Sequence, residues 1–150
     1  MKLSENFFLY EFLRSEAATR HDIDMTPPQF VIDNLKSLVV TVLQPLRTQL
    51  DRPLVVTSGY RPPKLNKLIG GSKTSAHRTG QAADFHINAM TPYDTCQAIL
   101  EMDLVFDQLI HEFAQWVHVG ISPIARQQEM TAIRQEGKTV YLPGIIEVGE

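Results

Sequence analysis

The stretch VFDQLIHEFAQWVHVGI (residues 105–121) consists of two runs with strand composition that are joined tightly. The runs, 105–113 and 116–121, are rich in β-branched and aromatic residues, which favour strands. Strands joined by so short a connection pair in the antiparallel sense. We therefore predict an antiparallel strand pair here.

A long amphipathic helix is predicted upstream of these strands. Apolar residues recur at helical spacing from Val31 to Leu46 and mark one buried stripe. Thr26 can cap this helix, and Pro27 suits its first position. Pro45 lies inside the pattern, so we expect it to kink the helix or to end its regular part.

The other predicted elements alternate between helices and strands along the chain. They are a short helix over 9–15, a strand over 54–57, a turn of helix near 64–68, a strand over 82–87, a helix from 91 to about 102, and a hairpin within 130–142 that turns at Glu136-Gly137. This order predicts a single α+β domain over residues 1–150, with a mostly antiparallel sheet and helices packed on one side. Residues 58–80 form a long loop, and such loops are usually functional.

Composition excludes several classes of protein. The chain of 150 residues has a net charge of −3, so we do not expect it to bind nucleic acid. Its one cysteine allows neither an internal disulfide nor a cysteine-based zinc site. No run is long enough for membrane insertion, and Met1–Tyr10 lacks the apolar core of a secretory signal. We expect a monomer that is synthesised in the cytoplasm.

A candidate metal site emerges from three side chains. The strand over 82–87 holds Asp84 beside an apolar face, where an unpaired carboxylate is costly and needs a cation. His77 lies across a glycine-containing turn, and His118 projects from the core-forming strand over 116–121. Each histidine alone is more simply explained as packed or solvated. Together, two histidines and one carboxylate with an open position are typical of catalytic zinc.

Three separated motifs in this order resemble a known family. SGYR (58–61), LNKLIGGSKTSAHRTGQAADF (65–85) and FDQLIHEF with WVHVGI (106–121) are similar to the zinc D-alanyl-D-alanine carboxypeptidase family of murein peptidases. More narrowly, they resemble its phage and prophage branch, which includes L-alanyl-D-glutamate endopeptidase endolysins. The likeness runs from FFLYEFLRSEAA near the N-terminus to about Ile121.

The resemblance implies a site and an activity. His77, Asp84 and His118 would bind one Zn²⁺ ion, and Arg61 would hold substrate and polarise the carbonyl under attack. Ser75 would bond to substrate or support a zinc ligand. The expected reaction is amide hydrolysis in peptidoglycan stem peptides, of carboxypeptidase or endopeptidase type. The enzyme would reach the wall after lysis, holin release or particle delivery.

The general base is the point where the chain departs from the family pattern. Much of the family places a carboxylate three residues before the last histidine, but Gln115 stands there and cannot act as a base. Glu112 is the nearest carboxylate and is our candidate. A strict two-residue turn at 114–115 would instead pair His111 with His118. His111 therefore stays open as the base, as does a catalytically impaired, zinc-containing module that binds the cell wall or belongs to a phage particle.

Overall fold

The computed structural model describes residues 1–148 and contains a six-stranded sheet in the order β1-β2-β4-β3-β5-β6. The strands are β1 (Val55–Ser58), β2 (Ala82–His86), β3 (Gln108–Glu112), β4 (Trp116–Gly120), β5 (Gln128–Gln135) and β6 (Lys138–Pro143). Neighbouring strands are antiparallel, except that β3 and β5 run parallel. The predicted α+β class with a mostly antiparallel sheet is confirmed.

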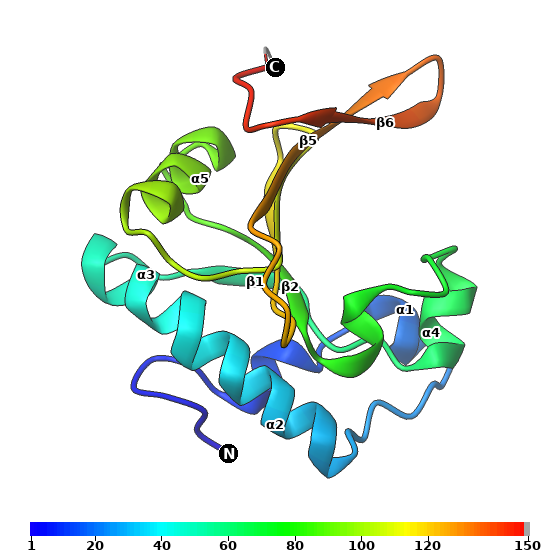
Figure 1. Ribbon diagram of the computed structural model, residues 1–150. Helices are drawn as coiled ribbons and strands as arrows, with labels where there is room; N and C mark the ends of the chain where they lie inside the picture. Colours follow the sequence, from blue (N-terminus) through cyan, green and yellow to red (C-terminus); the bar gives the residue numbers. More distant parts are fainter. Residues whose placement is uncertain (149–150) are drawn as a thin grey trace.

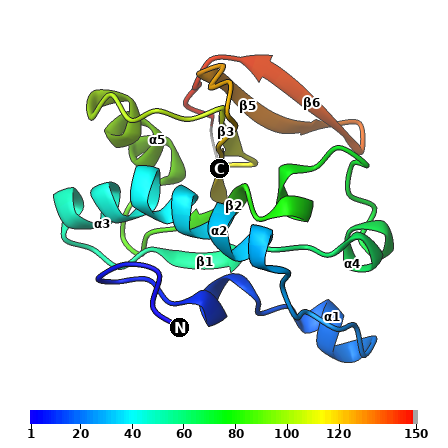
Figure 2. The same ribbon diagram turned by 60° about the horizontal axis from the view of Figure 1, so that its bottom comes forward.

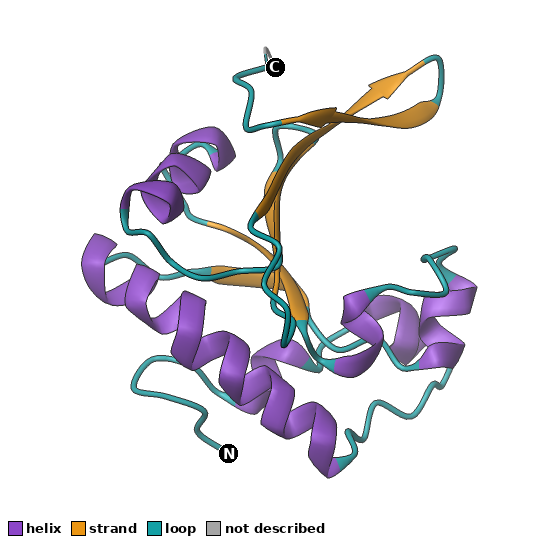
Figure 3. Cartoon of the chain, in the orientation of Figure 1, coloured by secondary structure: helices purple, strands orange, loops and turns teal. Residues whose placement is uncertain are grey.

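The longer helices cover one side of this sheet. The helical segments are η1 (Leu9–Phe12), α1 (Glu16–Arg20), α2 (Gln29–Leu38), η2 (Val39–Leu43), α3 (Gln44–Leu50), α4 (Pro63–Leu68), η3 (Ala76–Thr79) and α5 (Pro92–Glu101). Figures 1 and 3 show α2, α3 and α5 on one side, with α1 and α4 on the other. Figure 2 shows β1 and β6 at opposite ends of the sheet. No helix within the described residues is long and apolar enough to cross a membrane.

The core lies between the sheet and the long helical rod. From the sheet, Ala83, Phe85 and Val117 project into it and are completely buried. From the helices it receives Val31, Leu35, Leu38, Val39, Val42, Leu43, Leu46, Cys96 and Ile99. Each large apolar side chain buried in this way contributes roughly 1.5–3 kcal/mol. This packing fixes one face of the sheet and leaves the opposite face free for polar side chains.

The long helix begins later than its sequence predicts. Helix α2 starts at Gln29 with Pro28 as its N-cap, so the expected capping by Thr26 is wrong. The backbone N–H and hydroxyl of Thr26 both donate to the Asp24 carboxylate, at 2.9 and 2.6 Å. This local turn, common for aspartate, holds Thr26 outside the helix.

The irregularity expected at Pro45 takes the form of a π-helical turn. Segment η2 (Val39–Leu43) is π-helical, and the N–H of Gln44 donates to the carbonyl of Val39. Proline lacks an N–H and its ring crowds the carbonyl four residues earlier, here that of Thr41. The wider turn relieves that conflict without ending the rod.

The N-terminal helix predicted over 9–15 is also wrong in its bounds. The chain forms the 3₁₀ turn η1 (Leu9–Phe12) and then α1 (Glu16–Arg20), with Ser15 as an N-cap that accepts a bond from Ala18 at 3.1 Å. By contrast, the hairpin turn at Glu136-Gly137 is confirmed, because both residues have positive φ, 53° and 76°.

Replacing Gly80 with alanine should destabilise the fold more than the same change at Gly137. Both glycines have φ of +76°, but a Cβ at Gly80 would lie 2.8 Å from the Val31 carbonyl oxygen, whereas one at Gly137 meets nothing within 4 Å. We expect Gly80→Ala to lower the free energy of unfolding by roughly 2–4 kcal/mol and Gly137→Ala by about 1 kcal/mol. Urea unfolding measures the free energy of unfolding of both variants. Equal losses of stability would contradict the close approach of Gly80 to α2.

Candidate metal centre

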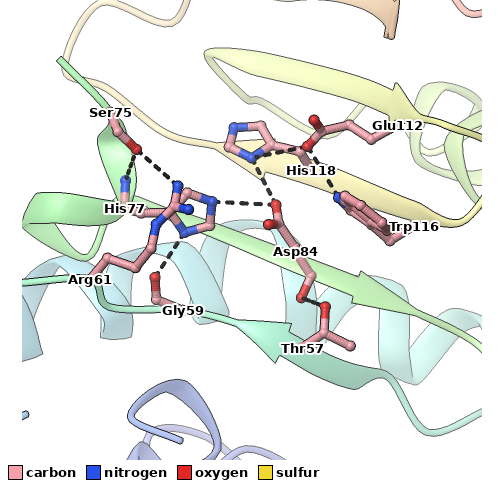
Figure 4. Close-up of polar contacts among 9 residues, drawn as sticks. All are labelled: Thr57, Gly59, Arg61, Ser75, His77, Asp84, Glu112, Trp116 and His118. Atoms are coloured by element: carbon pink, nitrogen blue, oxygen red, sulfur yellow. Dashed lines mark hydrogen bonds and ion pairs between the residues drawn. The ribbon is translucent and has the colours of Figure 1, made fainter. Parts of the chain in front are cut away.

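Pairing between β2 and β4 sets Asp84 directly opposite His118. Their neighbours Ala83, Phe85 and Val117 project into the core, so these two side chains leave the sheet on the other face. The Oδ1 atom of Asp84 lies 2.9 Å from Nδ1 of His118. Figure 4 shows the two side chains meeting above the sheet. The sheet register alone therefore brings together two of the predicted ligands.

His77 comes to the same point from outside the sheet. It lies on the 3₁₀ turn η3, which Gly80 ends in a left-handed conformation. The backbone N–H of Arg61 donates to the His77 carbonyl at 2.9 Å and so ties η3 to the segment after β1. The Nε2 atom of the buried His77 ring lies 3.3 Å from Oδ1 of Asp84. The long loop thus delivers the third predicted ligand.

These three side chains fit a divalent ion. One ligand atom from each of His77, Asp84 and His118 lies within 4.8 Å of the others. Zinc bonds of about 2.1 Å at tetrahedral angles separate ligand atoms by about 3.4 Å, so closure around an ion needs only small shifts. In the described residues, no other group of three or more histidine, cysteine or acidic residues meets this criterion.

The hydrogen bonding of His77 also favours a cation. Its Nδ1 lies 2.8 Å from the Gly59 carbonyl oxygen, which can only accept, so Nδ1 carries the hydrogen. Nε2 of the neutral ring then directs a lone pair at the Asp84 carboxylate. A cation between these two atoms converts this repulsion into shared coordination. A carbonyl that orients the ring from behind is the usual support for a metal-binding histidine.

The charges keep the ligands in forms that bind metal. Burial alone would raise the pKa of Asp84, but the hydrogen bond from His118 and the closeness of both imidazole rings hold that pKa well below its usual range. Burial lowers the pKa of His77 by more than Asp84 raises it, so this ring is neutral. Burial also opposes protonation of His118, yet the hydrogen bond and charge of Asp84 raise its pKa. A proton on His118 is therefore the main competitor of the metal.

The turn between β3 and β4 decides which residue joins the ligands. It is not the two-residue turn considered above, because Phe113, Ala114 and Gln115 all lie between the paired residues Glu112 and Trp116. Phe113 and Ala114 have positive φ, 58° and 54°. With this longer turn Ile110, rather than His111, is the partner of His118. Glu112 therefore shares the face of His118, with its Oε1 3.8 Å from Nδ1 of that ring.

The structure places the two alternative positions away from the ligands. His111 lies on the core face of the sheet, 1% exposed, where its Nδ1 is 2.9 Å from the Ile146 carbonyl oxygen. It cannot reach the ion site. Gln115 is exposed at the end of the hairpin. Of Glu112, His111 and Gln115, only Glu112 lies next to the ligands.

Trp116 supports Glu112 in a way that its sequence position did not reveal. Its indole N–H donates to Oε1 of Glu112 at 3.2 Å. Burial raises the pKa of Glu112, and this exceeds the opposing effects of His118 and Trp116. A carboxylate with a raised pKa is a stronger base once it is ionised. A hydrogen bond from an indole across a hairpin has no local sequence signature, so this contact becomes visible only in the folded chain.

Arg61 and Ser75 lie on the opposite side of the ligands from Glu112, as Figure 4 shows. Nη2 of Arg61 donates to Oγ of Ser75 at 3.2 Å, and Ser75 also accepts from the N–H of His77 at 3.3 Å. Nε of Arg61 is buried and has no partner within residues 1–148. A groove of about 530 Å³ borders Arg61 and also contacts Arg14 and Tyr60. These donors can receive an anionic or carbonyl oxygen.

Two histidines and one carboxylate that leave a position open are typical of catalytic zinc sites. Here Glu112 and Arg61 flank these three side chains. Residues 5–120 match the family model for peptidase M15. The chain belongs to the peptidase M15 family, whose members are zinc peptidases. No curated protein matches the chain.

Zinc binding should depend on His77 and not on His86, which projects from the same face of β2 as Asp84. We expect His77→Ala to weaken zinc affinity by more than about a hundredfold, since even supporting residues contribute tenfold to a hundredfold. His86→Ala is the matched control and should retain the metal. Competition with a chromophoric chelator measures both affinities. Retained zinc in His77→Ala would contradict the ligand assignment.

Zinc affinity should fall as the pH decreases from 8 to 6. The pKa of His118 is raised above its ordinary value near 6.5, so protons begin to compete for this ring while the solution is still near neutral. We expect at least a roughly tenfold weakening across this range. Chelator competition at several pH values tests this, and a constant affinity would be inconsistent with a protonated His118 in the metal-free protein.

Proposed function

We propose that this protein hydrolyses amide bonds in the stem peptides of peptidoglycan, using one zinc ion held by His77, Asp84 and His118. The observation that carries the proposal is the position of Glu112, a half-buried carboxylate 3.8 Å from a ligand atom of His118. Membership of the peptidase M15 family supports the same chemistry.

The residues around the ligands supply the functions that hydrolysis needs. Zinc, when bound, would lower the pKa of a water molecule and polarise the carbonyl under attack. Glu112 would accept a proton from the attacking water and pass it to the leaving amine. Trp116 would orient Glu112 through the indole bond, so that the carboxylate does not need to reorganise during the reaction.

Arg61 would stabilise negative charge on the other side of the scissile bond. Its guanidinium borders the groove and would face a developing oxyanion or a substrate carboxylate. Ser75 would fix the guanidinium through the bond to Nη2. Stem peptides contain both carboxylates and amide carbonyls, so this cationic side suits them in either carboxypeptidase or endopeptidase action. The groove beside Arg61, which none of the three ligands lines, would take the part of the peptide that extends beyond the zinc site.

A catalytically impaired wall-binding or phage-particle module is the alternative function. The reason to consider it is Gln115, which occupies the usual position of the base and cannot act as one. Glu112 offers a carboxylate at the site from a different position in the chain, and this favours the enzyme. Access to the wall would follow lysis, holin release or particle delivery.

Replacing Glu112 with glutamine should separate catalysis from metal binding. We expect Glu112→Gln to retain zinc and to lose roughly 10²–10⁴-fold in kcat, the usual contribution of a general base. Gln115→Ala is the control and should keep the rate, because Gln115 is exposed on the turn. Release of new amino groups from purified peptidoglycan measures activity, and zinc content is determined in parallel.

The products identify the bond that is cut. Mass spectrometry of defined muropeptides after digestion distinguishes loss of a terminal D-alanine from cleavage nearer the sugar. If the zinc-loaded wild-type protein releases no amino groups from any peptidoglycan type, the hydrolase proposal fails and the binding module takes its place.

A further inference from the structure

The β5–β6 hairpin lies beyond the part of the chain that matches the family. The match ends at residue 120, whereas β5 and β6 cover residues 128–143. This hairpin extends the sheet directly beside Glu112, which pairs with Ala132 of β5. Ala132 in turn pairs with Tyr141 of β6. Paired residues on adjacent strands project to the same side, so Tyr141 shares the face of Glu112 and the zinc ligands.

The hairpin borders the site on the side away from Arg61. Figure 1 shows β6 reaching over the side of the sheet that carries α4, away from α2 and α5. Apolar side chains lie on the sheet between the ligands and Tyr141. The neighbours of His118 on β3 and β5 are Ile110 and Met130, and the neighbour of Glu112 on β5 is Ala132.

Aromatic contacts fasten the hairpin to the general base. The guanidinium of Arg134 on β5 lies 4.5 Å from the centre of the Phe113 ring. That ring packs edge to face against Trp116, with centroids 5.5 Å apart. Trp116 is the donor to Glu112. Cation–π and aromatic pairs of this kind hold the hairpin in a fixed relation to the base.

Tyr141 has the properties of a ligand-binding side chain. It is 53% exposed and therefore accessible to substrate. Burial of part of the side chain, together with the negative charges of Glu112 and Asp84, raises the pKa of its phenol. The hydroxyl thus stays protonated and can donate a hydrogen bond across the working pH range.

We propose that the β5–β6 hairpin forms the wall of the substrate cleft opposite Arg61, and that Tyr141 donates a hydrogen bond to an acceptor oxygen of the peptide there. This inference rests on the proposed function, since it assigns a second contact region to the same substrate. Together with Arg61 it gives the cleft a hydrogen-bond donor at each end. The segments on both sides of the scissile bond are then recognised.

The test compares Tyr141→Phe and Tyr141→Ala in the zinc-loaded protein, with Tyr10→Phe as the control. Tyr10 is similarly exposed, at 60%, and lies on η1. We expect Tyr141→Phe to raise KM about three- to tenfold and Tyr141→Ala about ten- to a hundredfold, with a much smaller change in kcat. Zinc content and the urea midpoint of Tyr141→Phe should match the wild type. Tyr10→Phe should leave KM unchanged.

A binding measurement separates this inference from the proposed hydrolysis. In the Glu112→Gln background, calorimetry with an uncleaved stem tetrapeptide should show the same loss of affinity when Tyr141→Phe is added. Wild-type cleavage with no effect of either Tyr141 variant on KM or affinity would overturn the hairpin inference alone. A wild-type protein that neither binds nor cleaves stem peptides would overturn the proposed function, and this inference with it.

Discussion

The contact between the Asp84 carboxylate and two imidazole rings is the constraint on which the site depends. A carboxylate beside a core is costly by several kcal/mol unless its oxygens are paired. Here one oxygen lies within 2.9 and 3.3 Å of ring nitrogens of His118 and His77. The first contact is fixed by strand register and the second by a loop that is bonded to the segment after β1. The three candidate ligands are consequently close together without an ion.

The turn after β3 shows how one additional residue changes the chemistry of a site. Side chains on a strand alternate between faces, so a shift of one residue exchanges the whole set. The turn of Phe113, Ala114 and Gln115 brings Glu112 to the ligands and sends His111 to the core. Two non-glycine residues with positive φ make this turn costly in isolation. Packing of Phe113 between Trp116 and Arg134 offsets part of that cost.

The sheet also joins the candidate metal site, which lies within the family match, to a segment outside that match. Strand β5 adds in parallel to β3, next to the strand end that carries Glu112. An edge left open there would expose unpaired backbone groups, and the hairpin covers them. The same pairing that completes the sheet therefore sets Tyr141 in line with Glu112.

The sequence alone indicated most of the local elements and the three candidate ligands. Periodicity marked the long helix, alternation marked β2 and β4, and Glu136-Gly137 marked the last turn, because such signals arise between residues close in the chain. His77, Asp84 and His118 were recognisable from their motifs. Only the tertiary structure decided the length of the turn after Glu112 and the hydrogen bond from Trp116 to Glu112. It also decided that the β5–β6 hairpin pairs with β3. These depend on strand pairing and packing between distant segments, and no local pattern encodes the register in which such segments meet.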